Sequence, residues 1–257
     1  MTSLIYTIKD RVASITLNRP EKRNALNEEL IQELSEALSA AEKDDSVKAI
    51  ILKANGNTFC SGADLDQLKA MQSNSYEENL ADSTRLKDLF LKIYTLKKIV
   101  VAQVEGYALA GGCGLATVCD FTFCTPESKF GYTEARIGFV PAIVMVFLIR
   151  KLGEKKAGQL LLGADIVPAE EAMNLGLVNQ IFEKNKIQQA VIDFSQKLIS
   201  QNSGSSMALT KQMISNLSGK SLEESLNYAA QQNAMARGSE DCKKGIKAFL
   251  EKKDLNW

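Results

Sequence analysis

The stretch from Glu105 to Pro141, EGYALAGGCGLATVCDFTFCTPESKFGYTEARIGFVP, joins a glycine-rich turn, a short apolar segment and the carboxylate of Glu134. The preceding run, Ile99–Val104, is apolar almost throughout, which is typical of a strand covered on both faces. Gly106 ends that strand, and the small residues 108–112 lead into a segment with helical spacing. A helix that starts in this way leaves backbone N–H groups without partners, so it can bind an anionic oxygen.

The second half of the stretch supplies an acid. Residues 120–123 alternate like a further strand, and the segment 130–134 places Glu134 just beyond an aromatic turn. A glycine-rich helix start followed by a lone acid indicates anion stabilisation coupled to proton transfer. The alternative for residues 112–114 is part of a dinucleotide fingerprint, but the third glycine is missing. The alternative for Glu134, taken alone, is a solvated surface carboxylate.

A second block, TFCSGADL at residues 58–65, follows a buried-type strand expected at 47–52. Together with NRPEKRNAL at 18–26, EGYALAGG and FGYTEARIGFVP, this block resembles the enoyl-CoA hydratase/isomerase family, also called the crotonase family, over essentially the whole chain. The resemblance implies an α/β fold, a crotonase-type spiral of ββα repeats with a C-terminal helical region. Residues 1–195 would form the spiral core, and residues 196–257 a C-terminal helical trimerisation region.

The resemblance also implies an acyl-CoA substrate, with coenzyme A as part of the thioester and with no separate cofactor or metal. The thioester oxygen would accept hydrogen bonds from the backbone N–H groups of Ala63 and Gly111, each worth roughly 3–4 kcal/mol of barrier. Hydratases of the family usually carry two glutamates. The second is matched by Glu134, whereas the first position is Gly114. A lone glutamate must act as both base and acid, so burial should raise its pKa.

Contacts to the CoA part of the substrate are implied near the start of the chain, in the TFCSGADL block and in the last helix. The residues concerned are Lys22, Arg23, Ala25, Ser61, Asp64, Leu65 and Lys252. Lys252 resembles a residue that reaches the CoA of a neighbouring subunit, and an ordinary surface lysine is the alternative. In the family, the C-terminal helices are exchanged between neighbouring subunits, so the resemblance implies a homotrimer or a dimer of trimers.

The sequence after Pro141 bears on the acyl group. The apolar run 143–149 is shorter than the ~17 residues that span a membrane, so we expect a buried helix that starts at residues 141–142. Gly114 combined with VPA at 140–142 resembles the 3-methylglutaconyl-CoA hydratases of leucine breakdown, which take a short, branched acyl group bearing a carboxylate. A related branch acts on similar groups attached to a carrier protein.

A long charged helix is expected at 76–98, in the region that lies over the acyl pocket in the family. Arg85 in this helix could meet an acidic acyl tail, and the alternative is a solvated arginine on the helix surface. Elsewhere the sequence predicts a hairpin around Lys9–Arg11, a helix at about 27–43 capped by Asn27, and helices to the C-terminus that include a capping box at Ser221–Glu224.

Composition excludes several classes of function. The 257 residues carry 31 basic and 31 acidic side chains, so the charge gives no support for a nucleic-acid partner or an anionic membrane. The chain has no histidine, which excludes Ser-His-Asp and Cys-His catalysis and histidine-ligated zinc. Its five cysteines form no C-x-x-C pair, and the N-terminus has no secretory pattern. These features predict reduced, mostly buried thiols in a cytoplasmic protein.

The sequence therefore leads to one main hypothesis and two alternatives. The main hypothesis is reversible hydration of a short, branched, α,β-unsaturated acyl-CoA, 3-methylglutaconyl-CoA, with Glu134 moving the proton. An enoyl-CoA isomerase needs one base and no water, so labelled water distinguishes it. A catalytically silent acyl-CoA-binding protein of the same fold is the second alternative, and the retention of Glu134 argues against it. The space at Gly114 could hold ordered water, Tyr132 or the substrate's own carboxylate.

Overall fold

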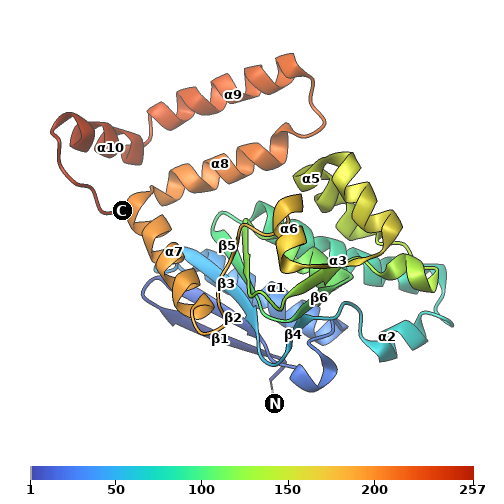
Figure 1. Ribbon diagram of the computed structural model, residues 1–257. Helices are drawn as coiled ribbons and strands as arrows, with labels where there is room; N and C mark the ends of the chain where they lie inside the picture. Colours follow the sequence, from blue (N-terminus) through green and yellow to red (C-terminus); the bar gives the residue numbers. More distant parts are fainter. Residues whose placement is uncertain (1) are drawn as a thin grey trace.

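The computed structural model describes residues 2–257, which form two sheets surrounded by helices (Figure 1). The strands are β1 (Leu4–Lys9), β2 (Val12–Leu17), β3 (Ala49–Ala54), β4 (Thr58–Cys60), β5 (Ile99–Val104), β6 (Tyr107–Leu109), β7 (Phe121–Cys124), β8 (Lys129–Gly131), β9 (Ile166–Pro168) and β10 (Gln180–Ile181). The helices are η1 (Pro20–Lys22), α1 (Glu28–Lys43), α2 (Leu65–Ala70), α3 (Tyr76–Thr95), α4 (Gly111–Val118), η2 (Glu134–Ile137), α5 (Ala142–Gly163), α6 (Ala169–Leu175), α7 (Ile187–Gln201), α8 (Gly204–Leu217), α9 (Leu222–Arg237) and α10 (Glu240–Leu250).

The chain alternates between the two sheets. The larger sheet has the order β1-β2-β3-β5-β7-β10, and the smaller has the order β4-β6-β8-β9. Strand β3 is followed by β4, β5 by β6 and β7 by β8, so each turn of the chain adds one strand to each sheet. The hairpin β1–β2 is antiparallel, whereas β2, β3, β5 and β7 run parallel in turn. The predicted α/β spiral is therefore confirmed.

The core lies on both faces of the larger sheet. All six residues of β5 are buried; Val100 and Ala102 join the cluster that includes α1, and Val101 joins the cluster under α7. The prediction of a strand covered on both faces is confirmed. Helix α1 turns a continuous apolar stripe to this core, and burying each of its large side chains contributes about 1.5–3 kcal/mol. The buried residues of α1 are Leu30, Ile31, Leu34, Ala37, Leu38 and Ala41.

Helix α5 differs from the buried helix that the apolar run predicted. It starts directly after Pro141, as expected, and Gly153 interrupts it with a φ of 75°. Phe147 faces the core, but Val146 and Ile149 are 51% and 36% exposed, so only one face of the helix is buried. Hydropathy alone predicted that every face of this helix is buried, because its outward-facing residues are apolar as well. Among residues 2–257, no helix is long and apolar enough to cross a membrane.

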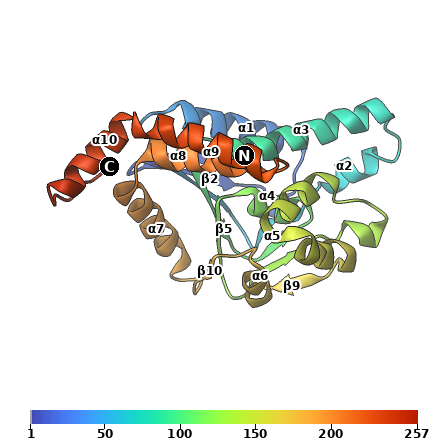
Figure 2. The ribbon, with the colours of Figure 1, turned by 90° about the horizontal axis from the view of Figure 1, so that it is seen from above.

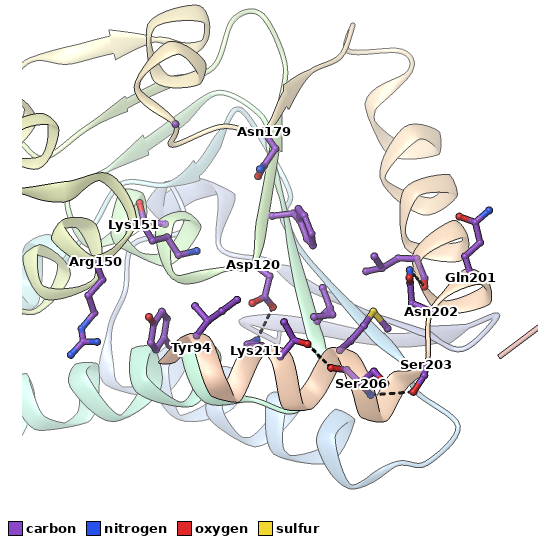
Figure 3. Close-up of a pocket in the computed structure, with 18 of the residues that line it drawn as sticks. Tyr94, Asp120, Arg150, Lys151, Asn179, Gln201, Asn202, Ser203, Ser206 and Lys211 are labelled. Atoms are coloured by element: carbon purple, nitrogen blue, oxygen red, sulfur yellow. Dashed lines mark hydrogen bonds and ion pairs between the residues drawn. The ribbon is translucent and has the colours of Figure 1, made fainter. Parts of the chain in front are cut away.

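The C-terminal helices leave the sheets after α7, and α8, α9 and α10 extend away from them (Figure 1). Helix α7 packs on β3, β5 and β7 and spans the predicted boundary at residue 195, so the first break after the core comes at Asn202. The division into two regions stays a prediction. Helix α8 is anchored to the core by Lys211, which lies across a cavity of about 840 Å³ from α5 and donates to Asp120 at 2.7 Å (Figure 3). Helices α9 and α10 extend beyond the sheet.

All five cysteines are unpaired, and four of them are buried. The prediction that the thiols are mostly buried is confirmed. Burial raises the pKa of the Cys60 and Cys113 thiols to about 12, so these side chains are apolar core residues rather than nucleophiles.

Candidate active site

Three segments of the chain meet around a pocket of about 240 Å³: the loop after β4, the start of α4, and η2. Ala63, Gly111 and Glu134, which the sequence marked for catalysis, all line this pocket. The helices around it, α2, α3, α4 and α5, lie on the side of the molecule away from α10 (Figure 2). Much of the remaining lining is apolar: Leu26, Ile31, Leu68, Leu86, Ile143 and Val144.

Local backbone geometry leaves the N–H of Ala63 without a partner. Ala63 forms an isolated parallel bridge with Leu26, in which the Leu26 N–H donates to Gly62 O at 2.7 Å and the Asp64 N–H donates to Leu26 O at 2.9 Å. Because the residues on either side of Ala63 make these two bonds, its own N–H is directed away from Leu26. Within the hydrogen bonds of residues 2–257, it has no acceptor.

The N–H of Gly111 is unpaired because Gly111 is the first residue of α4. The preceding residue, Ala110, has φ 51° and ψ −126°, a sparsely populated region for a residue with a side chain. A hydrogen bond of 2.7 Å from the Ala110 N–H to Gly131 O holds it there. The strained turn thus directs the start of α4, with its positive helix-dipole end, into the pocket.

Glycine at two positions allows these segments to touch. A Cβ on Gly62, which has a φ of 92°, would lie 2.8 Å from the Ala110 Cβ and 3.4 Å from the Gly111 nitrogen. A Cβ on Gly112 would lie 2.1 Å from the backbone oxygen of Cys60. Both contacts are too close for a side chain, so the two unpaired N–H groups come together only because these residues are glycines.

Arg19 holds the loop that carries Ala63. Its guanidinium donates to the Asp64 carboxylate at 2.9 Å and to Ala25 O at 2.6 Å, and it is mostly buried. The fully buried Asn24 accepts from the Arg19 N–H and donates to the backbone oxygens of Asn55 and Thr58. Burial would raise the pKa of the Asp64 carboxyl, but bonds from the Asp66 N–H and Arg19 outweigh it, and the pKa lies below its usual value.

Sequence reasoning missed this role of Arg19, because it used Arg19 only as part of the NRPEKRNAL block that carries the family resemblance. The sequence does contain a signal for this role: Arg19 lies in one motif block and Asp64 in another. A buried acid needs a cationic partner, so the two residues could have been paired.

Glu134 stands at the start of η2 and is 8% exposed. Its Oε2 atom is buried and has no hydrogen-bond partner among the described residues. Burial raises the pKa of this carboxyl above its ordinary value, and the expected direction is confirmed. A buried carboxylate with a free oxygen can accept a proton and release it again.

Val144 of α5 fills the space beside Gly114. A Cβ on Gly114 would lie 2.1 Å from the Val144 Cγ1 and 3.1 Å from the Phe90 ring, so the site has no room for a second glutamate at this position. The sequence suggested ordered water, Tyr132 or the substrate's own carboxylate in this space, but Val144 occupies it instead. Tyr132 is fully buried in the core, with its hydroxyl 2.8 Å from Thr117 Oγ1.

The residues predicted to contact CoA fall into three groups. Ser61 lines the pocket, and Ala25 and Asp64 are buried in the loops beside it. Lys22, Arg23 and Leu65 are exposed, and Lys22 Nζ lies 3.3 Å from the Asp66 carboxylate on α2. Lys252 was expected in the last helix but lies two residues after α10 ends at Leu250, and α10 is on the side of the molecule away from α2 (Figures 1 and 2).

Two pocket residues were not predicted from the sequence. Asp82 of α3 and Gln67 of α2 both line the pocket, and the Gln67 amide donates to the Asp82 carboxylate. Arg85, the predicted partner of an acidic acyl tail, lines a neighbouring cavity instead and pairs with Glu28 at 3.6 Å and Asp82 at 3.4 Å.

Two free backbone donors beside a buried carboxylate define a class of enzyme that stabilises an oxyanion while it moves a proton. The profile of the family described as enoyl-CoA hydratase/isomerase matches residues 7–257. A provisionally named enoyl-CoA hydratase of Thermus thermophilus is 41% identical over 97% of this chain and 98% of its own. The 2,3-dehydroadipyl-CoA hydratase of Escherichia coli is 31% identical over 98% and 97%. The chain therefore belongs to the enoyl-CoA hydratase/isomerase (crotonase) family and is an enzyme of that family.

Solved structures agree with this assignment. An enoyl-CoA hydratase of Mycobacterium smegmatis superposes with a TM-score of 0.92 at 30% identity, covering 99% of this chain and 98% of its own. The fold is the crotonase fold, as the resemblance implied.

Proposed function

We propose that the protein catalyses the reversible addition of water to a short α,β-unsaturated acyl-CoA. The observation that carries this proposal is the meeting of two unpaired N–H groups, from Ala63 and Gly111, with the buried carboxylate of Glu134 in one pocket. The hydratase names of relatives that are 30–41% identical support the same reaction. The pocket volume of about 240 Å³ lies below the roughly 300–1,000 Å³ of drug-sized ligand sites, which suits a short acyl group.

The reaction follows from the placement of these groups. The thioester oxygen accepts hydrogen bonds from the N–H groups of Ala63 and Gly111, which draws electrons from the double bond. Glu134 takes a proton from a water molecule as the water oxygen adds to the β-carbon, and the negative charge moves to the thioester oxygen. Glu134 then returns the proton to the α-carbon, so that water is added overall and the carboxylate is restored. The two backbone donors stabilise the enolate between these steps.

Coenzyme A enters this scheme only as part of the substrate. We place its contacts at Lys22, Arg23, Ala25, Ser61, Asp64 and Leu65 in one subunit and at Lys252 of a neighbour. Because the Asp64 carboxylate is occupied by Arg19, Asp64 would act through its backbone and by holding the loop, not through a charge on the ligand.

The finer expectation, 3-methylglutaconyl-CoA, comes from Gly114 and the VPA sequence. Its acyl group carries a carboxylate, which would need a cation in the pocket. Arg85 is the candidate that the sequence offered, but its guanidinium faces Glu28 and Asp82 at the neighbouring cavity. We therefore keep the proposal at short enoyl-CoA thioesters and use the diacid as a test compound.

One observation favours an isomerase as the second candidate. Since Val144 excludes a second glutamate at Gly114, a single base remains, and moving a double bond requires only one base. The two activities can be distinguished by incubating the purified protein with crotonyl-CoA and with a 3-enoyl-CoA and measuring the mass of each product. Gain of water by crotonyl-CoA supports the hydratase, whereas conversion of only the 3-enoyl-CoA, without gain of mass, supports the isomerase. Binding of both without turnover supports the silent protein.

We further propose that residues 196–257 join three chains in a homotrimer, alone or paired with a second trimer. Helices α9 and α10 leave large apolar side chains exposed in the single chain, which is typical of surfaces that bind another protein. These residues are Leu222, Leu226, Met235, Ile246, Phe249 and Leu250, each at least 53% exposed.

A further inference from the structure

The wall of the pocket formed by α2 and α3 is polar and carries a carboxylate. Gln67 and Asp82 both contribute to the lining, and the Asp82 side chain is only 17% exposed. The amide of Gln67 donates to one oxygen of Asp82, which fixes the carboxylate in the wall. Glu134 supplies a second carboxylate to the same pocket.

Cations do not balance these charges inside the pocket. Of the described residues that line it, none is a lysine or an arginine. Arg85 offsets part of the charge of Asp82 from behind, but it also pairs with Glu28, so two carboxylates share one guanidinium and one net negative charge remains. In so small a cavity, an acyl carboxylate could not be placed far from Asp82 and Glu134.

We propose that Asp82, held by Gln67, is a specificity-determining residue that excludes acyl groups bearing a carboxylate and favours acyl groups with a neutral or hydrogen-bond-donating end. The physical basis is the repulsion of like charges in a small pocket with a mostly apolar lining, which acts against the wrong substrate. A donor such as an amide or hydroxyl would instead find acceptors on Asp82. This inference rests on the proposed hydratase function and names its substrate class.

The test compares two acyl groups of the same shape: 3-methylglutaconyl-CoA and the analogue in which its free carboxylate is a primary amide. We expect the native enzyme to favour the amide by at least about tenfold in kcat/KM. Asp82→Asn should remove most of this preference, chiefly by improving kcat/KM for the acid. Asp88→Asn is the matched control, because Asp88 lies on the same helix, is 61% exposed and pairs with Lys87 on the surface; it should leave the preference unchanged.

A second variant keeps the proposal testable if Asp82→Asn fails to fold. Gln67→Glu adds a carboxylate to the same wall and should strengthen the preference for the amide. The proposal is overturned if the native enzyme prefers the acid, or if neither variant changes the ratio of the two substrates.

Failure of the proposed function is recognised separately. Crotonyl-CoA has no polar end group, so its hydration does not depend on Asp82. If crotonyl-CoA is not hydrated, the function fails, and calorimetry with the saturated acid and amide thioesters then tests Asp82 by binding alone. Tighter binding of the amide that is lost in Asp82→Asn supports the specificity role, and equal binding of both compounds overturns it.

Discussion

In the proposed reaction, burial prepares Glu134 for two successive proton transfers. Its Oε2 atom has no hydrogen-bond partner among residues 2–257, and the loss of hydration raises the pKa of the carboxyl. A carboxylate with a raised pKa binds a proton more readily than a free glutamate, which suits a group that must accept a proton from water and return it. Val144 leaves no space for a second glutamate. A single residue must then act as both base and acid, and a raised pKa suits it to both roles.

Glu134→Gln should therefore lower kcat by at least about 100-fold, because the amide cannot accept the proton of water. In the native enzyme, activity should fall as pH drops through the raised pKa, so the acidic limb of the rate profile should lie above the ordinary glutamate value of 4.5. Steady-state rates over a range of pH check both statements. A loss of only a few-fold would remove Glu134 from the reaction.

The same substitution should stabilise the fold at neutral pH. The folded protein holds the Glu134 proton to a higher pH than the unfolded chain does, so the ionised carboxylate costs stability once the pH exceeds both pKa values. Glu134→Gln removes that cost, and Tm should rise at neutral pH. Well below pH 4.5 both states are protonated and the gain should disappear. A lower Tm at neutral pH would contradict this account.

Sequence reasoning at the residue scale could propose Ala63, Gly111 and Glu134 for catalysis because they lie in motif blocks, and their catalytic roles stay predictions. It did not point to Arg19, Gln67 and Asp82, because their contacts join residues far apart in the chain. A charged helix such as α3 shows little apolar periodicity, so the sequence could not tell that Asp82 faces the pocket while Arg85 faces its neighbour.

At the scale of elements, α4 and α5 are fitted to each other through Gly114 and Val144. Gly114→Glu should lower stability by at least about 1–3 kcal/mol, because the new side chain meets Val144 at less than contact distance. Adding Val144→Gly should recover part of this loss by vacating the space. Thermal unfolding of the two variants measures the effect. If Gly114→Glu alone is as stable as the native chain, Val144 does not close this position.

The anchor of α8 gives a second prediction at this scale. Lys211→Met should cost about 3 kcal/mol, because it leaves the partly buried Asp120 without its cation. Adding Asp120→Asn should restore part of the stability, since the amide oxygen can still accept from the Val100 N–H. Denaturant titrations of the single and double variants measure these changes in the free energy of unfolding. Lys243→Met is the control: its pair with Glu240 is exposed, so the change should stay below about 1 kcal/mol.

The sequence predicted the long elements better than the short ones. Helix α1 was expected at 27–43 and begins at Glu28, because its apolar stripe and capping Asn27 are both local signals. The three-residue strands β4, β6 and β8 were not predicted as strands, since three residues are too few to show a period. They pair only because the larger sheet brings the turns of the spiral together.

For the whole molecule, the exposed apolar residues of α9 and α10 predict assembly. Sedimentation of the purified protein should give the mass of three or six chains. Phe249→Ser with Leu250→Ser should shift it towards the single chain, because these side chains are 83% and 73% exposed in isolation. A single-chain mass for the native protein would contradict the trimer and leave Lys252 without a neighbour to serve.

The central claim is that one buried glutamate and two backbone donors add water to an enoyl-CoA. The most direct measurement is the mass of the product formed from crotonyl-CoA in water enriched with oxygen-18, for the native enzyme and for Glu134→Gln. The account predicts one labelled oxygen atom in the product of the native enzyme and almost none with Glu134→Gln. No labelled product from the native enzyme, or undiminished labelling by the variant, would contradict it.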